Sequence, residues 1–545
     1  MSDFSFVPSA PPRSRDTWLL KALAADLGEA GYTVDGVAGF LGEDASAALQ
    51  RDQLVPALLA CRAEAGTDSP RRVALPVLLW LLGETVERAQ LDAALPRTGT
   101  EGLLELGLIE RGRIFGTFRA AVDLRPYGAD DGGAGTDGNT DGNPGGDLWV
   151  ASDLGSHQRP GVLRRDHVLG IGQASLSLAQ LTVRRPVGRA LDLGTGCGIQ
   201  TFHLLRHAEH VTATDISERA LAFARFNLLL NAPQLGIDAE QPEERFTLRL
   251  GSLLEPVAGE TFDLVVSNPP FVITPRRGPD TEADRFTYRD GGMAGDGIVA
   301  ALVSGLETVL NPGGTAQMLG NWEIPADSED EWSERLQQWL PEETDAWAIQ
   351  RETLTPPEYA EMWLRDAAQG RDREDYVEAY AGYLADFASR NVGSVGFGSL
   401  WLRRRRNPGA EPLRRFEEIT HPIEQPVGPH LEAAVARSDW LASCPDLAAA
   451  HLLVAEDVTE ERHQRPGAEH PGVILLRQGA GLRRTNLMST ELTGFVSACD
   501  GELSAGQITA ALAALLGRPD PGFGTELLQE VRNLVLDGFL VPPPE

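Results

Sequence analysis

The sequence predicts an α/β protein with a doubly wound, Rossmann-like parallel sheet at its centre and largely helical domains on either side. Between residues 186 and 320, short apolar runs typical of buried strands alternate with runs of helical spacing. This alternation produces parallel strands joined by crossover helices. A glycine-rich turn, LGTGCG, follows the first strand, and a rigid turn, SNPPF, follows the fourth. The length of 545 residues exceeds one ordinary core and indicates two to four domains.

The elements of the central domain are expected in a regular order. Strands are expected at 189–194, 210–216, 246–252, 262–268 and 314–322, helices at 199–208, 217–231 and 297–310, and a last strand at 394–404. Ligands of doubly wound folds bind at the carboxyl ends of the strands. Both unusual turns fall at those ends.

The flanking regions divide the chain further. A helix, a turn and two strands at 100–127 resemble a winged helix, and a similar pattern closes the chain. Because no basic recognition helix is visible, we favour packing over nucleic-acid binding for the first of these units. The expected parts are a helical, winged-helix-like domain at 1–127, a flexible Gly/Asp-rich loop at 128–147, the central domain at 148–408 with a helical cap insertion at about 330–390, and a winged-helix-like domain at 409–545.

Composition excludes several classes of protein. Hydrophobic residues make up 42% of the chain, so each domain can bury a core. No apolar run is long enough for a bilayer, and residues 1–18 lack the apolar stretch of a secretory signal, which predicts a cytoplasmic protein without membrane contact. The four cysteines are widely spaced, so we expect neither a metal site nor a disulfide framework.

The formal charge of −31 disfavours a nucleic-acid partner unless basic residues gather locally. A basic strip running from the SNPPF turn, through Arg276 and Arg277, to Arg403–Arg406 would favour such a partner. The basic stretches of the sequence lie at 184–189, 274–278 and 401–415.

The turn after the first strand is suited to a nucleoside that carries an amino acid. Gly194, Gly196 and Gly198 let the backbone turn sharply and approach a ligand closely, in a spacing that departs from the dinucleotide fingerprint. Asp192 can hold an ammonium group, which NAD lacks, and Asp215 at the end of the next strand can accept both hydroxyls of a ribose. S-adenosylmethionine (SAM) carries this set of groups.

Together the motifs resemble those of class I SAM-dependent methyltransferases. DLGTGCG resembles the glycine motif, ATDIS the ribose-binding acidic motif, and SNPPF the (N/D/S)-P-P-(Y/F/W) catalytic motif; the resemblance covers roughly a quarter of the chain. TDISERALAFARFN and YRDGGMAGDGI (288–298) are similar to segments of HemK-type release-factor glutamine methyltransferases. NPPF with phenylalanine is also frequent in ribosomal RNA base methyltransferases.

The resemblance implies roles for individual residues. The catalytic turn is expected to be Asn268, Pro269, Pro270 and Phe271, and SAM is expected to contact Asp192, Gly194, Thr195, Gly196, Gly198, Asp215, Ile216, Ser252 and Asn268. Ser252 stands where the family usually has a carboxylate for the adenine amino group, and a hydroxyl accepts that hydrogen bond more weakly. Asp166 and His167 are candidates for contact with the cofactor, and Asp290 or Asp296 for fixing a loop near the substrate.

The SNPPF turn is suited to methylation of a planar nitrogen. Such a nitrogen has its lone pair delocalised and must lose conjugation to attack a methyl group. The Asn268 side-chain carbonyl and a proline carbonyl can accept its N–H groups and stabilise the growing positive charge. Pro269 and Pro270 fix these carbonyls, and Phe271 can stack on a flat amide or base.

Several functions therefore compete. The first is methylation of a glutamine side-chain amide in a protein or peptide, which the HemK-like segments and the acidity favour. The second is methylation of an exocyclic amine of an rRNA or DNA base, and the third is a SAM-binding scaffold without catalysis. A small-molecule substrate is a further alternative. The sequence does not predict the oligomeric state.

Overall fold

The computed structural model describes residues 10–51, 53–67, 70–128, 147–155, 158–159, 164, 166–275, 292–326, 332–366, 373–407, 411–518 and 520–543. These residues form two compact units, the first made of most of the chain up to residue 418 and the second of 180–184 with 419–545. No helix within these ranges is long and apolar enough to cross a membrane. The expected Gly/Asp-rich loop lies almost entirely outside the described residues.

The first unit begins with short helices and a small sheet. Asp16 and Thr33 cap the first two helices, because their side chains accept hydrogen bonds from the Leu19 and Gly36 N–H groups. Helix α6 is followed by β2 and β3, which gives the expected order of helix, turn and strands, and β1 joins these strands in a β1–β3–β2 sheet. The elements are α1 Thr17–Glu29, α2 Val34–Leu49, α3 Val55–Ala65, α4 Ala74–Pro76, the π-helical η1 Val77–Leu81, β1 Val86–Glu87, α5 Arg88–Ala94, α6 Gly99–Leu106, β2 Ile109–Arg111, β3 Thr117–Ala120, β4 Asp123–Tyr127 and β5 Leu148–Ser152.

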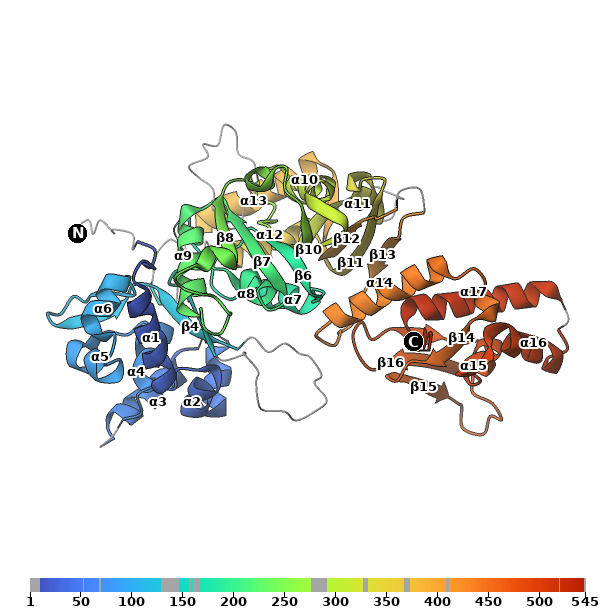
Figure 1. The fold of residues 1–545 in the computed structure, drawn as a ribbon, viewed down its shortest axis with the longest axis horizontal. Coiled ribbons are helices and arrows are strands. Elements are labelled where there is room, and N and C mark those ends of the chain that lie inside the picture. The colour runs from blue at the N-terminus through green and yellow to red at the C-terminus, as the bar shows by residue number, and fades with distance from the viewer. Residues whose placement is uncertain are drawn as a thin grey trace. The chain divides into compact units, whose positions relative to one another are not determined.

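The central sheet has eight strands in the order β13-β11-β12-β10-β9-β6-β7-β8 (Figure 1). Five neighbouring strands, β8, β7, β6, β9 and β10, are parallel. Numbered along the chain, they follow the 3-2-1-4-5 order of a doubly wound sheet, which confirms the predicted fold class. β12 is antiparallel to both of its neighbours. The strands are β6 Val187–Leu193, β7 Ala208–Asp215, β8 Phe246–Leu250, β9 Phe262–Ser267, β10 Leu310–Pro325, β11 Thr344–Leu354, β12 Val392–Arg404 and β13 Arg414–Glu418.

Helices cover both faces of this sheet, as a buried parallel sheet requires. Ala190 of β6 packs in a cluster with Phe202, whereas the next residue, Leu191, packs in a second cluster with Leu302 of α10. Alternate residues of one strand thus serve two cores. The helices are α7 Gln173–Leu181, α8 Ile199–Leu204, α9 Glu218–Leu230, α10 Gly297–Gly305, α11 Ser333–Trp339, α12 Pro356–Asp366 and α13 Arg373–Ser389.

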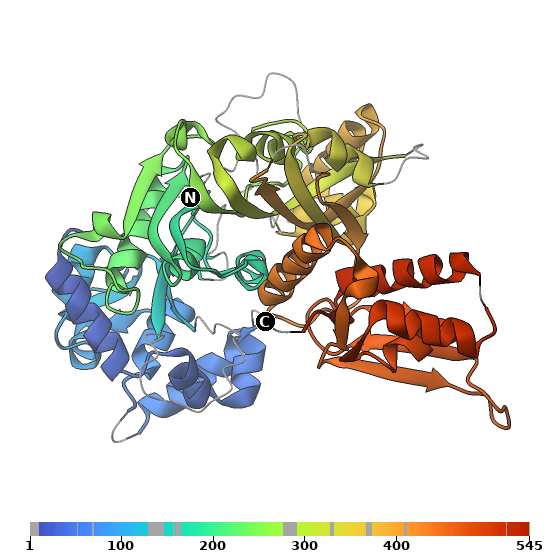
Figure 2. The same ribbon diagram turned by 45° about the vertical axis from the view of Figure 1, so that its right-hand side comes forward.

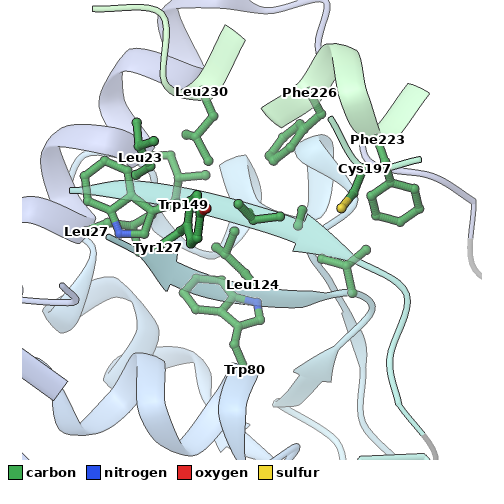
Figure 3. Packing of buried hydrophobic residues seen from close by; sticks show 14 of the residues in the cluster. Leu23, Leu27, Trp80, Leu124, Tyr127, Trp149, Cys197, Phe223, Phe226 and Leu230 are labelled. Carbon is green, nitrogen blue, oxygen red and sulfur yellow. The ribbon is translucent and has the colours of Figure 1, made fainter. Parts of the chain in front are cut away.

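The β4–β5 ribbon lies between the N-terminal helices and α9 (Figure 3). Asn227 of α9 and Asn231, the residue directly after this helix, complete the hydrogen bonds of β5. Asn227 Oδ1 accepts from the Ala151 N–H (2.8 Å) and its Nδ2 donates to Ala151 O (2.9 Å). Asn231 does the same for Trp149, with distances of 2.8 and 2.7 Å. A helix thus takes the place of a neighbouring strand.

Apolar packing joins the N-terminal elements to the sheet. Trp80 of η1 lies on one side of the ribbon and Phe226 and Leu230 of α9 on the other (Figure 3). The Trp149 indole N–H also donates to Tyr32 O (2.7 Å). The same buried cluster includes residues of α8, β6 and β9, so the N-terminal helices share a core with one face of the central sheet.

The antiparallel end of the sheet corrects two sequence expectations. A helical cap is expected at 330–390, but β11 occupies part of that range, and only α11, α12 and α13 are helical. β11 escapes detection because buried polar residues interrupt its apolar pattern: Asp345 pairs with Arg403, and Gln350 accepts from an indole N–H of β10 (2.9 Å). β13 pairs with β11 in this sheet, although the C-terminal domain is expected to begin at residue 409.

The second unit has its own core and two small sheets, ordered β18-β14-β19 and β15-β16-β17. Helices α16 and α17 lie side by side within it (Figure 2). Its end has the expected helices followed by a short strand. The elements are α14 Gly428–Ser443, β14 His451–Val454, β15 Val458–His463, β16 Val473–Gln478, β17 Thr485–Leu487, α15 Thr490–Val496, β18 Asp500–Ser504, α16 Ala505–Leu515, α17 Pro521–Asp537 and β19 Leu540–Val541.

Replacing Asn227 tests the link between α9 and β5. Asn227→Ala leaves the Ala151 N–H and C=O groups without their partners, and each unpaired buried group costs free energy, so the first unit should lose about 2–4 kcal/mol of stability. Thermal unfolding followed by circular dichroism measures the change, with the exposed Asn533→Ala as the control. Equal melting temperatures for the two variants would contradict this role.

Candidate functional site

The two unusual turns of the sequence meet at the switch point of the sheet. β6 pairs with β7 on one side and with β9 on the other, and Leu193 lies opposite Ser267. The Ser267 hydroxyl donates to Leu193 O (2.8 Å) and ties the two strand ends together. Gly194 directly follows Leu193, and Asn268 directly follows Ser267. The glycine loop and the SNPPF turn are therefore neighbours at the edge where doubly wound folds bind ligands.

The glycine loop needs glycine because of its backbone conformation. Gly194, Gly196 and Gly198 have φ values of 79°, 56° and 96°, a region that other residues rarely adopt. A Cβ added at Gly194 or Gly196 would meet nothing within 4 Å, so open space adjoins the loop. A Cβ at Gly198 would lie 3.5 Å from Ala224, which shows that this position faces α9.

Asp192 is a buried carboxylate behind the loop, with no exposed surface. Its Oδ2 accepts hydrogen bonds from the hydroxyls of Thr195 and Thr201, both at 2.6 Å. Its Oδ1 is buried and has no partner among the described residues. Burial raises the pKa of Asp192 to about 6. A buried carboxylate with one unpaired oxygen fits a cationic ligand group.

Asp215 holds the loop as well as facing the site. Its Oδ2 accepts from the Gly196 N–H (3.0 Å) and its Oδ1 from the Ser217 N–H (2.9 Å). Burial raises its pKa. Each carboxylate oxygen keeps lone-pair capacity for a further donor, such as a hydroxyl.

Ile216 and Ser252, two further candidates for contact with the cofactor, lie close to Asp215. Ile216 follows Asp215 directly, and the residue is 59% exposed. The Gly251 N–H donates to Asp215 O (3.0 Å), which brings Ser252 to the same edge of the sheet. The side chain of Ser252 is half-buried. The residues that the sequence assigns to the cofactor thus lie at the carboxyl ends of four neighbouring parallel strands, β6, β7, β8 and β9.

The SNPPF turn is tight. The Phe271 N–H donates to Pro269 O (2.8 Å), so this proline carbonyl already accepts one hydrogen bond. The Asn268 side chain is half-buried and has no hydrogen-bond partner in the described part of the chain. Phe271 is partly buried against the core cluster that contains Leu191, so packing takes up part of the ring that the sequence assigns to stacking.

The weaker candidates are engaged in the fold. Asp296 is buried and pairs with Arg335 (2.5 Å), which agrees with a loop-fixing role, whereas Asp290 lies outside the described residues. Asp166 pairs with Arg164 (2.8 Å). His167 is buried 4.0 Å from a carboxylate oxygen of Asp153, and burial lowers its pKa. None of these contacts assigns a ligand to Asp166 or His167.

The basic stretch after β12 does not lead to the SNPPF turn. Because β12 is antiparallel to β10, its end lies at the opposite edge of the sheet from Asn268, and Arg404 donates to Leu310 O (2.8 Å) there. Arg403 pairs with Asp345 (2.7 Å). Arg189 of the first basic stretch pairs with Glu260 near that same edge. Arg276 and Arg277 lie outside the described residues.

Sequence reasoning missed three features of this region. Thr201 binds Asp192, and its place seven residues after Gly194 on the following helix is the signal that could have shown it. Ser267 is the first residue of the SNPPF turn itself. His203 and His207 stand four residues apart, a spacing that can present two imidazoles to a metal ion. Nevertheless, no group of three or more metal-ligating side chains occurs among the described residues.

Comparisons with known proteins identify the central region. Residues 155–283 match a family described as "Methyltransferase small domain", and residues 29–121 match one described as a domain of unknown function. The first match contains the glycine loop, Asp215 and the SNPPF turn. The resemblance to SAM-dependent methyltransferases is therefore confirmed for this part of the chain.

Two curated relatives agree with this family. A release factor glutamine methyltransferase of Geobacter sulfurreducens is 34% identical over 134 residues, which are 23% of this chain and 42% of that protein. Ribosomal RNA small subunit methyltransferase C of Alcanivorax borkumensis is 28% identical over 138 residues, or 25% and 34% of the two chains. The chain thus spans less than half the length of either relative.

A SAM-dependent methyltransferase of Thiobacillus denitrificans, solved with S-adenosyl-L-homocysteine, aligns over 46% of this chain and 96% of that one, with 14% identity and a TM-score of 0.24. The family and both sequence relatives are methyltransferases, which supports the expected enzyme class and SAM as the cofactor.

Binding of S-adenosylhomocysteine should depend on the charge of Asp192. The ammonium group of S-adenosylhomocysteine is attracted by the ionised carboxylate of Asp192 and not by the protonated one, and burial raises the pKa of Asp192 to about 6. The dissociation constant should therefore be lowest above pH 6 and rise by up to about tenfold per pH unit below it. Isothermal titration calorimetry from pH 5 to pH 8 measures this, and Asp192→Asn should remove the inflection. An unchanged inflection in that variant would assign the titration to another group.

Proposed function

We propose that the chain is a SAM-dependent N-methyltransferase that methylates a planar nitrogen, with the side-chain amide of a glutamine in a protein or peptide as its substrate. One observation carries this proposal: the glycine loop and Asn268 adjoin at the switch point, where the Ser267 hydroxyl binds Leu193 O (2.8 Å). A cofactor held by the loop and a nitrogen held by Asn268 would meet at one edge of the sheet.

The residues of the loop fit SAM. The unpaired, buried Oδ1 of Asp192 is an acceptor for the ammonium group, and the space beside Gly194 and Gly196 leaves room for the amino-acid part. Asp215 can accept the ribose hydroxyls, and the exposed Ile216 offers apolar surface to a flat base. Bound SAM supplies an electrophilic methyl group on its sulfonium sulfur.

Asn268 is the residue that acts on the substrate. Its side-chain carbonyl can accept an N–H of the substrate amide, and this hydrogen bond strengthens as positive charge grows on the attacking nitrogen. Pro269 and Pro270 keep the turn from rearranging when the substrate arrives. The bond from the nitrogen to the methyl carbon would form as the carbon–sulfur bond breaks, and S-adenosylhomocysteine would leave with that electron pair. The nitrogen would then release one proton to water, so the reaction needs no dedicated general base.

Charge supports a protein or peptide substrate over a nucleic acid. The basic stretches around Arg189 and Arg403 form ion pairs near the sheet edge opposite Asn268 and offer no track to the SNPPF turn. The chain carries a formal charge of −31, which repels polyphosphate. A glutamine methyltransferase of release factors is among its relatives.

A nucleobase amine is the second candidate. Its support is the similarity to ribosomal RNA small subunit methyltransferase C, together with the phenylalanine of NPPF and with Arg276 and Arg277, which follow this motif in the sequence. A SAM-binding scaffold and a small-molecule methyltransferase are alternatives that the same cofactor site also permits. A cytoplasmic location is part of the proposal, since translation factors and ribosomal RNA are found there.

Replacing Asn268 separates catalysis from cofactor binding. Asn268→Ala removes the acceptor for the reacting amide, so methyl transfer should fall by at least about 100-fold. The dissociation constant of S-adenosylhomocysteine should stay within about twofold, because the glycine loop is intact. Asp215→Asn is the matched control, with weaker cofactor binding by about tenfold. Wild-type turnover in Asn268→Ala would show that the proposed mechanism is wrong.

Radiolabelling decides the class of substrate. Cell lysate is incubated with the protein and tritiated SAM, and the products are treated with nuclease or with protease. Label in macromolecules that survives nuclease and is released by protease supports the glutamine proposal. Label released by nuclease would make the chain a nucleobase methyltransferase. Asn268→Ala serves as the background in both treatments.

A further inference from the structure

Helices α12 and α13, here called the cap helices, hold the segment that follows the SNPPF turn. Tyr359 of α12 accepts a hydrogen bond from the Ile273 N–H (2.8 Å), two residues beyond Phe271. Tyr359 is fully buried, and Ile273 packs in the same apolar cluster. The contact therefore links the segment directly after the SNPPF turn to α12.

Aromatic side chains hold the Tyr359 ring in place. Phe397 of β12 stacks on it with ring centroids 5.7 Å apart and an interplanar angle of 22°. Phe387 of α13 meets it edge-on at 5.3 Å. A ring held from both sides presents its hydroxyl at a fixed point.

Asn321 reaches the same hydroxyl from the sheet. Its Nδ2 donates to Tyr359 Oη (3.2 Å), and its own Oδ1 is buried without a partner among the described residues. Asn321 belongs to β10, the strand that pairs with β9, and lies three residues beyond Met318, which is opposite Ser267. The hydroxyl of Tyr359 thus connects α12, β10 and the chain leaving β9.

We propose that Tyr359 is a positioning residue, which fixes the Asn268–Phe271 turn by holding the Ile273 N–H. This inference rests on the proposed function, because the turn is taken as the substrate site. The unpaired Asn321 oxygen supports it, since a buried polar group without a partner lowers stability and such arrangements persist at functional sites. Tyr359 lies beyond the matched segment 155–283, so the positioning device is a feature of the cap.

The test removes the hydroxyl and keeps the ring. Tyr359→Phe should leave the packing with Phe397 and Phe387 intact, and thermal unfolding checks that the variant is folded. The control is Tyr380→Phe, which removes a hydroxyl from the same helix pair; Tyr380 binds Glu361 (3.1 Å) at the surface and does not reach Ile273.

Hydrogen–deuterium exchange measures, without a substrate, how firmly Tyr359 holds the segment after the SNPPF turn. In Tyr359→Phe, amides of residues 271–274 should exchange at least about fivefold faster than in wild type, whereas Tyr380→Phe should leave them unchanged. Unchanged exchange at 271–274 in the folded Tyr359→Phe variant would overturn the proposal. This result does not depend on the methyltransferase activity.

Kinetics then test positioning against simple packing. On a substrate identified by radiolabelling, Tyr359→Phe should lower kcat by about tenfold and leave the dissociation constant of S-adenosylhomocysteine within about twofold. A variant with faster exchange but wild-type kcat would refute the positioning role and leave a structural one. If the wild-type protein transfers no methyl group at all, the proposed function fails, while the exchange measurement still decides whether Tyr359 holds the turn.

Discussion

The parallel pairing of β6 with β9 is the constraint on which the site depends. It brings two segments more than seventy residues apart in sequence into register, so that Leu193 and Ser267 lie opposite each other. The hydrogen bond between the Ser267 hydroxyl and Leu193 O fixes this register at the last residue of each strand. The glycine loop and the SNPPF turn follow this pair directly, and the pairing of β7 with β6 and of β8 with β7 adds Asp215 and Ser252.

The acidic residues of the site also belong to the scaffold. Asp215 accepts hydrogen bonds from the Gly196 and Ser217 N–H groups, and Asp192 accepts from two threonine hydroxyls. Both carboxylates are desolvated, and burial is the main cause of their raised pKa values. Hydrogen bonds to the charged form offset part of that cost. The loop is therefore held in its shape before a ligand arrives, which lowers the entropy that binding must overcome.

Much of the site could be predicted from sequence because glycines, a strand-ending aspartate and a double proline each have few structural explanations. The positions of Gly194, Asp215 and Asn268 follow from that local chemistry together with the rule that parallel strands share a carboxyl edge. The strand β11 could not be predicted, since its buried Asp345 and Gln350 are satisfied by residues distant in sequence. Tyr359 was hidden for the same reason, because its partner Ile273 is 86 residues away.

Asn227 of α9 and Asn231, directly after this helix, have a consequence for association between chains. A strand with an open edge offers unpaired N–H and C=O groups to any other strand, which promotes aggregation. The edge of β5 that faces away from β4 carries such groups at Trp149 and Ala151. Because Asn227 and Asn231 occupy them, this edge is closed to a strand of another molecule.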